Sequence, residues 1–115
     1  MTSYEFAVLE TVDPTIAVVE IAGEIHLTNA PELESRLEDA AAGRRGLVVE
    51  LNRVSFIDSA ALHVFFRTAR RLTRERFGVV LDPAAAVART LTIVGLPDVV
   101  TLRGSIEEAC ADLAP

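Results

Sequence analysis

The sequence predicts an α/β fold in which a mixed sheet of four to five strands has about four helices packed on it, within a single domain of residues 1–115. Short β-branched runs alternate along the chain with longer amphipathic stretches. The first two runs are separated by too few residues for a helix, which indicates an antiparallel pair. Helical stretches separate the later runs and indicate parallel strands. No linker or internal repeat divides the chain.

Two strands are predicted first. Residues 4–11 alternate apolar and polar side chains, as a half-buried strand does. Asp13-Pro14 is typical of a turn. A second apolar run begins at Ile16, and we expect Gly23 to end it.

A helix is predicted next. Residues 29–32, Asn-Ala-Pro-Glu, fit a capping box in which the Asn29 side chain would accept a hydrogen bond from the first turn. Leucine and alanine then recur at helical spacing, while acidic side chains cover the opposite face. Gly43 predicts the C-terminal stop.

The middle of the chain predicts a strand-helix-strand unit. Residues 47–51 are almost continuously apolar, which is typical of a strand covered on both faces. We interpret residues 54–57 as an apolar connection. A long helix then begins at Asp58-Ser59, with apolar positions inward and arginines outward. Residues 77–81 predict the following strand.

The last third of the chain predicts two helices and a short strand. The first helix is expected at residues 84–94, with Val94 in its apolar seam. Residues 99–102 fit a short edge strand. Ser105 and Glu108 fit a second capping box, at the start of a terminal helix.

Composition excludes several classes of function. The chain has a formal net charge of −6 and no lysine, so it has no general attraction to nucleic acid. No apolar run approaches the ~20 residues that span a bilayer, and the N-terminus lacks a basic and apolar signal segment, so membrane insertion and secretion are not expected. The single cysteine, Cys110, cannot form an internal disulfide, and we expect a buried thiol and a cytoplasmic location.

Three motifs give the sequence a resemblance to a known family. The stretch from Leu47 to Leu72, LVVELNRVSFIDSAALHVFFRTARRL, contains a buried strand, an apolar pair followed by Asp-Ser, and a helix that begins with small residues and leucine. Residues 22–25, Ala-Gly-Glu-Ile, and residues 94–96, Val-Gly-Leu, match two further family segments in order and spacing. Together these motifs resemble STAS domains, which bacterial anti-sigma-factor antagonists share with the cytosolic tails of sulfate transporters.

The resemblance implies a function and its partners. In the antagonist branch, the serine after the aspartate is phosphorylated by an anti-sigma factor that is also a serine kinase, and a PP2C-type phosphatase resets it. The unphosphorylated antagonist binds that kinase and frees a sigma factor. The matching residue in this chain is Ser59. The resemblance therefore implies a non-enzymatic antagonist without a cofactor, switched off by phosphorylation at Ser59.

The expected partner-binding surface surrounds Ser59. Two positions depart from the family pattern, because Ala60-Ala61 replaces Ser-Gly and His26 replaces the acidic residue that follows Gly-Glu-Leu. The residues expected to contact the partner are Glu24, His26, Asp58, Ser59, Ala60, Ala61 and His63.

A serine in this position suits a phosphate. The start of a helix has unpaired N–H groups and the positive end of the helix dipole, and both favour an anion. Aspartate and serine are also preferred helix caps, and we expect Asp58 to cap the helix while Ser59 points outward.

Other interpretations of these residues stay open. The main alternative is a constitutive STAS module that acts as a signalling scaffold or as a soluble subunit of a membrane transport system. An enzyme with Ser59 and His63 as nucleophile and base lacks a Gly-x-Ser-x-Gly elbow. Two histidines without short spacing make a poor site, and no metal is expected. The arginines of residues 67–76 form either a solvated helix face or a surface that guides an acidic partner.

Overall fold

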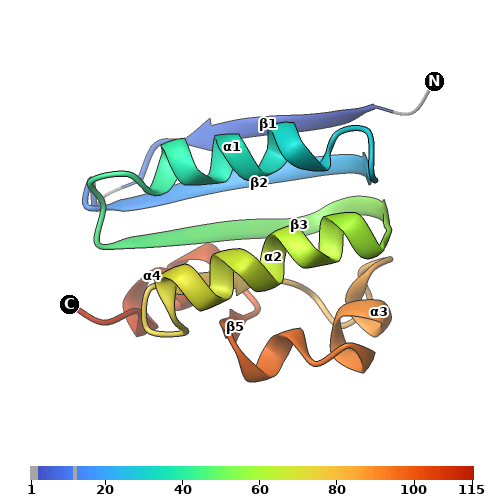
Figure 1. The fold of residues 1–115 in the computed structure, drawn as a ribbon. Helices are drawn as coiled ribbons and strands as arrows, with labels where there is room; N and C mark the ends of the chain where they lie inside the picture. Colours follow the sequence, from blue (N-terminus) through green and yellow to red (C-terminus); the bar gives the residue numbers. More distant parts are fainter. Residues whose placement is uncertain (1–2, 12) are drawn as a thin grey trace.

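The computed structural model describes residues 3–11 and 13–115. Within them, five strands form one sheet in the order β1-β2-β3-β4-β5 (Figure 1). The strands are β1 (Tyr4–Leu9), β2 (Ile16–Ile25), β3 (Gly46–Ile57), β4 (Phe77–Val80) and β5 (Thr101–Arg103). The helices are α1 (Ala30–Ala41), α2 (Ser59–Leu72), α3 (Ala88–Ile93), the short 3-10 helix η1 (Leu96–Asp98) and α4 (Ile106–Asp112). This confirms the predicted α/β class and the mixed sheet.

Strand direction places the ends of two neighbouring strands together. The pair β1 and β2 is antiparallel, and the pairs from β2 to β5 are parallel. The parallel pairing sets Ile25, the last residue of β2, beside Ile57, the last residue of β3. The chain segments that leave these two strands therefore begin at one edge of the sheet.

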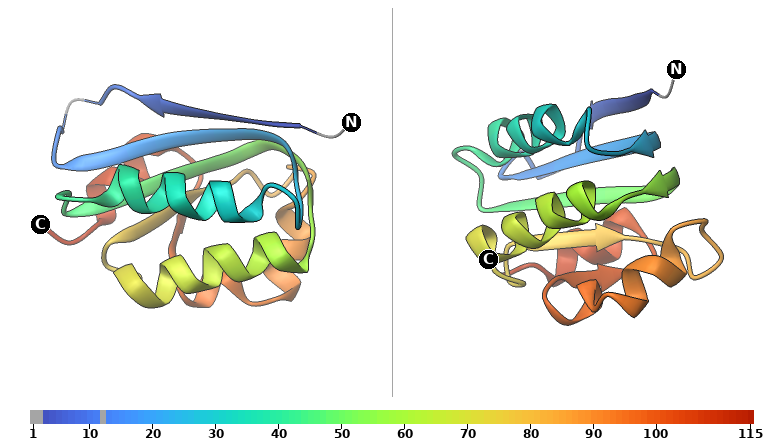
Figure 2. Two further views of the ribbon diagram at one scale, coloured as in Figure 1. Left: turned by 45° about the horizontal axis from the view of Figure 1, so that its top comes forward. Right: turned by 45° about the vertical axis from the view of Figure 1, so that its right-hand side comes forward.

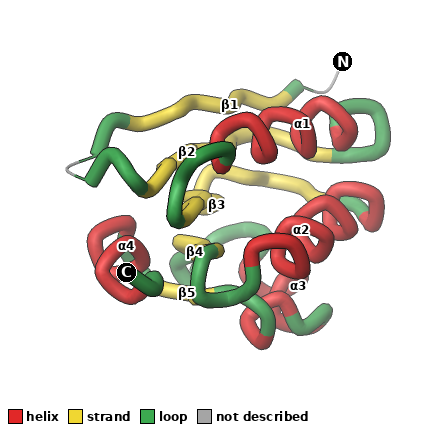
Figure 3. Tube along the Cα trace, turned by 60° about the vertical axis from the view of Figure 1, so that its left-hand side comes forward, coloured by secondary structure: helices red, strands yellow, loops and turns green. Residues whose placement is uncertain are grey.

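Helices cover the two faces of the sheet unequally. Figure 2 shows α1 and α2 side by side on one face, and Figure 3 shows α4 on the other. Alternate residues of β2 supply the two apolar clusters: Val19 and Ile21 belong to the cluster under α1, α2 and α3, whereas Ile16 and Val18 belong to the cluster under α4.

Two strands are longer than the sequence predicted. Gly23 does not end β2, and residues 54–57 are not a connection but the last part of β3. Two register shifts let the strands stay paired to their ends, and Gly23 lies between them. Its φ of +95° and the 2.5 Å that would separate an added Cβ from the Ser3 carbonyl oxygen explain the glycine.

The predictions for the last third were partly wrong. The helix expected at residues 84–94 is only the six residues of α3, because the Asp82 carboxylate accepts the Ala84 N–H in a preceding turn. Val94 is 41% exposed and lies outside the apolar seam. The edge strand is β5, which begins two residues later than expected. The Ser105 cap of α4 is confirmed, since its hydroxyl accepts the Glu108 N–H, while the Glu108 carboxylate accepts a hydrogen bond from that hydroxyl.

Candidate functional site

The candidate site lies at the edge where β2 and β3 end and α2 begins. Ser59 is the first residue of α2 and is exposed. The loop from β2 to α1 lies at the same end of the molecule, on the right of Figure 1. Because β2 and β3 are parallel, this loop and the start of α2 are neighbours although they are about 30 residues apart.

Asp58 fastens the loop to the helix. One carboxylate oxygen accepts the N–H of Ala61 at 3.0 Å and caps α2, and the other accepts the N–H of Leu27 at 2.9 Å. The Asp58 N–H in turn donates to the Ile25 carbonyl at 3.2 Å. This confirms that Asp58 caps the helix while Ser59 points outward.

The same contacts fix the charge of Asp58. The hydrogen bond from the Ala61 N–H, together with that from Leu27, holds the pKa of the Asp58 carboxyl below its usual range, against the opposing effect of burial. Asp58 is therefore a carboxylate at neutral pH. At the start of α2, the Asp58 oxygens therefore already accept hydrogen bonds from N–H groups that, from the sequence, were expected to bind a phosphate.

Asn29 organises the loop but does not form the predicted capping box. Its side-chain oxygen accepts the N–H of His26 at 2.9 Å, and its amide nitrogen donates to the Glu24 carbonyl at 3.0 Å. The backbone of Asn29 is helical, with φ −110° and ψ −5°, and its side chain makes no cap hydrogen bond. The Thr28 hydroxyl lies 2.7 Å from the Nδ1 atom of His26.

The structure gathers the predicted residues at one end but in different environments. Ser59 and His63 are exposed, and Ala60 is half-buried. Ala61 is fully buried, so its side chain packs beneath the helix and is not on the surface. Glu24 and His26 are half-buried, one at the end of β2 and the other at the start of the loop.

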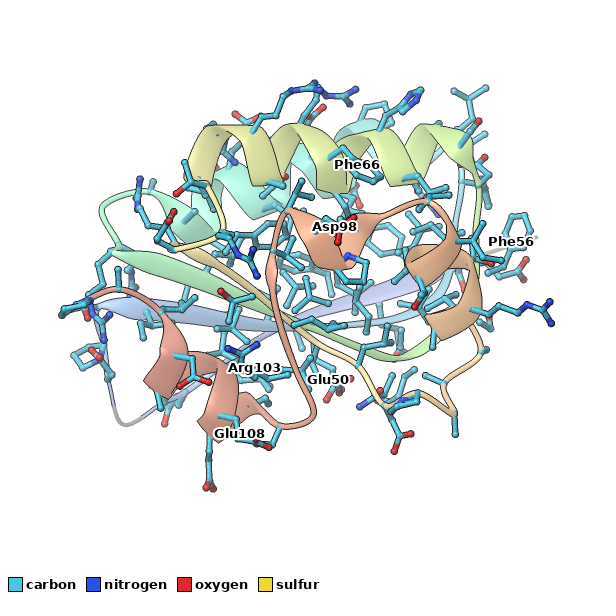
Figure 4. All side chains as sticks on the ribbon, turned by 90° about the horizontal axis from the view of Figure 1, so that it is seen from below. Glu50, Phe56, Phe66, Asp98, Arg103 and Glu108 are labelled. Carbon is cyan, nitrogen blue, oxygen red and sulfur yellow. The ribbon has the colours of Figure 1, made fainter. Side chains whose placement is uncertain are left out.

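Two exposed apolar side chains lie at the same end of the molecule as Ser59, and neither was predicted from the sequence. Leu27 is 70% exposed on the loop, and Phe56 is 49% exposed near the end of β3. Figure 4 shows Phe56 projecting from the end of the molecule at which α2 begins. Alternation within the strand does not predict this exposure, because it would place Phe56 on the same face as Val54, which is buried.

A small groove joins the two helices beside Ser59. It has a volume of about 220 Å³ and is lined by Leu27, Ala30, Pro31, Glu34, Ala60, His63 and Arg67. Arg67 forms two hydrogen bonds with the Glu34 carboxylate, at 2.7 and 2.8 Å, and so ties α2 to α1. This pairing lowers the pKa of Glu34. Arg67 is thus a structural cation rather than an unpaired member of the predicted arginine surface.

The described residues contain no group of three or more His, Cys, Asp or Glu side chains that could hold a metal ion. They also contain no helix long and apolar enough to cross a membrane.

Residues 7–109 match the sequence profile of the STAS domain. The chain belongs to the STAS domain family. Among curated members of this family, it is 29% identical to the anti-sigma-F factor antagonist RsfB of Mycobacterium tuberculosis, over 82% of this chain and 78% of RsfB. It is 31% identical to the anti-sigma-B factor antagonist of Bacillus subtilis, over 77% of this chain and 83% of that protein.

Solved STAS structures share the fold. An anti-sigma factor antagonist from Mycobacterium paratuberculosis superposes with a TM-score of 0.80 and 29% identity, over 95% of this chain and 92% of that chain. The antagonist SpoIIAA in its unphosphorylated form gives a TM-score of 0.65 at 19% identity, over 94% of this chain and 96% of that chain, and supports the fold alone.

Proposed function

We propose that this STAS domain is an anti-sigma-factor antagonist that binds an anti-sigma factor with serine kinase activity and is released when that kinase phosphorylates Ser59. A PP2C-type phosphatase would restore the binding form. The observation that carries the proposal is the position of Ser59, exposed at the start of α2 and directly after the capping Asp58. The names of the relatives support the antagonist role.

The surroundings of Ser59 suit a protein interface. Leu27 and Phe56 supply exposed apolar area at the end of the molecule where Ser59 lies, and apolar area that is exposed in the free protein can be buried against a partner. The carboxylate of Asp58 fixes the loop that carries Leu27, so the apolar and hydroxyl groups keep one arrangement. A pre-organised surface binds with a smaller entropic cost.

A phosphate on Ser59 would act on the interface and leave the fold intact. It adds about −1.5 to −2 charges beside the ionised Asp58. Because Asp58 already accepts the Ala61 N–H, the helix start offers the phosphate few donors, and the group stays at the surface. Repulsion and desolvation worth about 4 kcal/mol would weaken binding by about a thousandfold.

The test is affinity purification from the cell that makes this protein, with wild type and Ser59→Asp as baits and mass spectrometry of Ser59. Capture of a kinase-type anti-sigma factor by wild type, its loss with Ser59→Asp, and phosphate on Ser59 are expected. Unmodified Ser59, with the same transport or scaffold proteins on both baits, would instead establish a constitutive STAS module and refute the switch.

A further inference from the structure

The face of the sheet that carries α4 is only partly covered. There α4 packs against β3, β4 and β5, whereas α1 and α2 share the opposite face (Figure 3). A groove of about 810 Å³ remains between α4 and the adjoining ends of β1 and β2. A sheet face normally buries its apolar side chains against another element, and this part of the face has no such element among the described residues.

The floor of this groove, which we call the α4 groove, is apolar. Val18 and Leu113 form its buried base, while Leu9, Ile106 and Cys110 are half-buried and reach its surface. Ile106 and Cys110 are four residues apart on α4 and therefore share one helix face. Burial raises the pKa of the Cys110 thiol, which keeps it uncharged. The result is an apolar strip with a helix on one side and a strand end on the other.

The rim of the α4 groove is acidic. Glu10, Asp13 and Glu107 line it together with one cation, Arg45. Arg45 is engaged within the protein, since it pairs with Asp13 at 2.6 Å and donates to the Ala114 carbonyl at 2.6 Å. The hydrogen bonds from Thr15 and Arg45 lower the pKa of Asp13 to about 2. Glu10 and Glu107 are exposed and give the rim its negative character.

We propose that the α4 groove docks an amphipathic helix of a partner protein, with lysine or arginine side chains along the edges of its apolar face. An apolar helix face fits the strip between α4 and the strand ends, in the manner of other helix-in-groove complexes. Basic edges meet Glu10 and Glu107. A second copy of this chain fits poorly, because a two-fold contact through the groove would bring the same carboxylates together.

This site is separate from Ser59. Arg45 precedes the first residue of β3, whereas Ser59 follows the last, so the two sites are separated by the length of a 12-residue strand, or roughly 35 Å. Figure 4 shows α4, marked by Glu108, away from the end that carries Phe56. A helix in the α4 groove can therefore bind together with a partner at Ser59, and its binding does not depend on the proposed switch.

The test uses two synthetic peptides of about 14 residues, roughly four helical turns, with the same apolar face and either lysine or glutamate along its edges. Fluorescence anisotropy is expected to show binding of the lysine peptide alone, weakening as salt is added. The lysine peptide should also slow alkylation of Cys110 by iodoacetamide, and Cys110 is the single cysteine of the chain. The variant Ser59→Asp should bind the peptide as wild type does.

Two groove variants and one control sharpen the test. Ala111→Arg adds a bulky cation at an exposed groove position and should abolish binding without disturbing the core. Replacing Glu10 and Glu107 together by lysine should weaken binding about tenfold. Glu38→Lys, an exposed charge change on α1, should leave binding unchanged. Equal binding of both peptides, full binding by Ala111→Arg, or a dimer that the peptide does not dissociate would each overturn the proposal.

Discussion

The helices α2 and α4 begin in the same way, yet only one of these beginnings forms part of the candidate site. Asp58 accepts the N–H of Ala61 at 3.0 Å, and Ser105 accepts the N–H of Glu108 at 3.1 Å. Both side chains satisfy a donor that would otherwise be unpaired. Both capping residues have an extended backbone and accept the N–H of the third residue after them.

The two capping side chains differ in the second contact that each of them makes. The other Asp58 oxygen binds the N–H of Leu27, which is 31 residues away, whereas the Ser105 hydroxyl lies 3.1 Å from the Glu108 carboxylate of its own helix. The first cap therefore connects two chain segments, and the second stabilises only its own helix. A cap becomes part of a site when the fold provides a distant partner for it.

The largest expected difference between the two helix starts is in partner binding after a negative charge is added at each of them. Ser59→Asp should weaken binding of the anti-sigma factor by roughly a hundredfold, less than a phosphate would, because a carboxylate at this exposed position adds one negative charge beside Asp58. Ser59→Ala should keep wild-type affinity and resist phosphorylation. Ser105→Asp is the matched control and should bind as wild type does, since aspartate is also a good cap. Calorimetry with the captured partner measures all three affinities.

If Ser59→Asp and Ser105→Asp bound the partner equally well, the proposed interface at the start of α2 would be wrong. If both lost binding, a general effect of net charge would be responsible, and the local argument would fail.

Removing each capping side chain should lower the free energy of unfolding by a different amount. Asp58→Ala is expected to lower the free energy of unfolding by about 2 kcal/mol, because it leaves both the Ala61 and the Leu27 N–H groups without their acceptor. Ser105→Ala removes one local bond and should cost about 1 kcal/mol. Urea denaturation of the two variants measures the difference. Equal costs would mean that the contact to Leu27 contributes nothing.

The two caps should also differ in their response to acid. The folded-state pKa of Asp58 is depressed, so its contribution is fully present above the unfolded value of about 3.9 and is lost as pH falls through the folded value. The stability difference between wild type and Asp58→Asn should therefore be constant above about pH 5 and shrink below about pH 4. A serine hydroxyl does not titrate in this range, so the hydrogen bond that Ser105 accepts from the Glu108 N–H should persist in acid. Thermal unfolding at several pH values tests both expectations.

The smallest effect is expected for the ion pair beside the site. Arg67→Gln removes the two hydrogen bonds to Glu34, but the pair is substantially exposed, and such pairs add little to stability. Its cost should be below that of Ser105→Ala, with partner binding nearly unchanged. A larger loss of binding than of stability would instead make Arg67 a contact residue, and a double-mutant cycle with Glu34→Gln would separate the two roles.

Much of the fold could be predicted from periodicity and caps. The start of β1, the buried run in β3 and the Ser105 cap of α4 all depend on neighbours within a few residues, and these were confirmed. The predicted alternation in β1 was wrong beyond Phe6, because Val8 is 67% exposed and the strand ends at Leu9. The errors occurred where a distant strand decides the outcome. Residues 54–57 continue β3 because β2 pairs with them, and no pattern within those four residues reports that pairing.

The candidate site also combines features that local sequence predicts with features that depend on distant parts of the chain. The family resemblance pointed to Ser59, and the local sequence predicted the Asp58 cap, because a cap is set by the geometry of one helical turn. Only the tertiary structure decided that Asp58 also holds the loop at Leu27, that Ala61 is buried, and that Leu27 and Phe56 are exposed beside Ser59. Those facts depend on the parallel pairing of β2 with β3, which brings two chain segments together at one edge of the sheet.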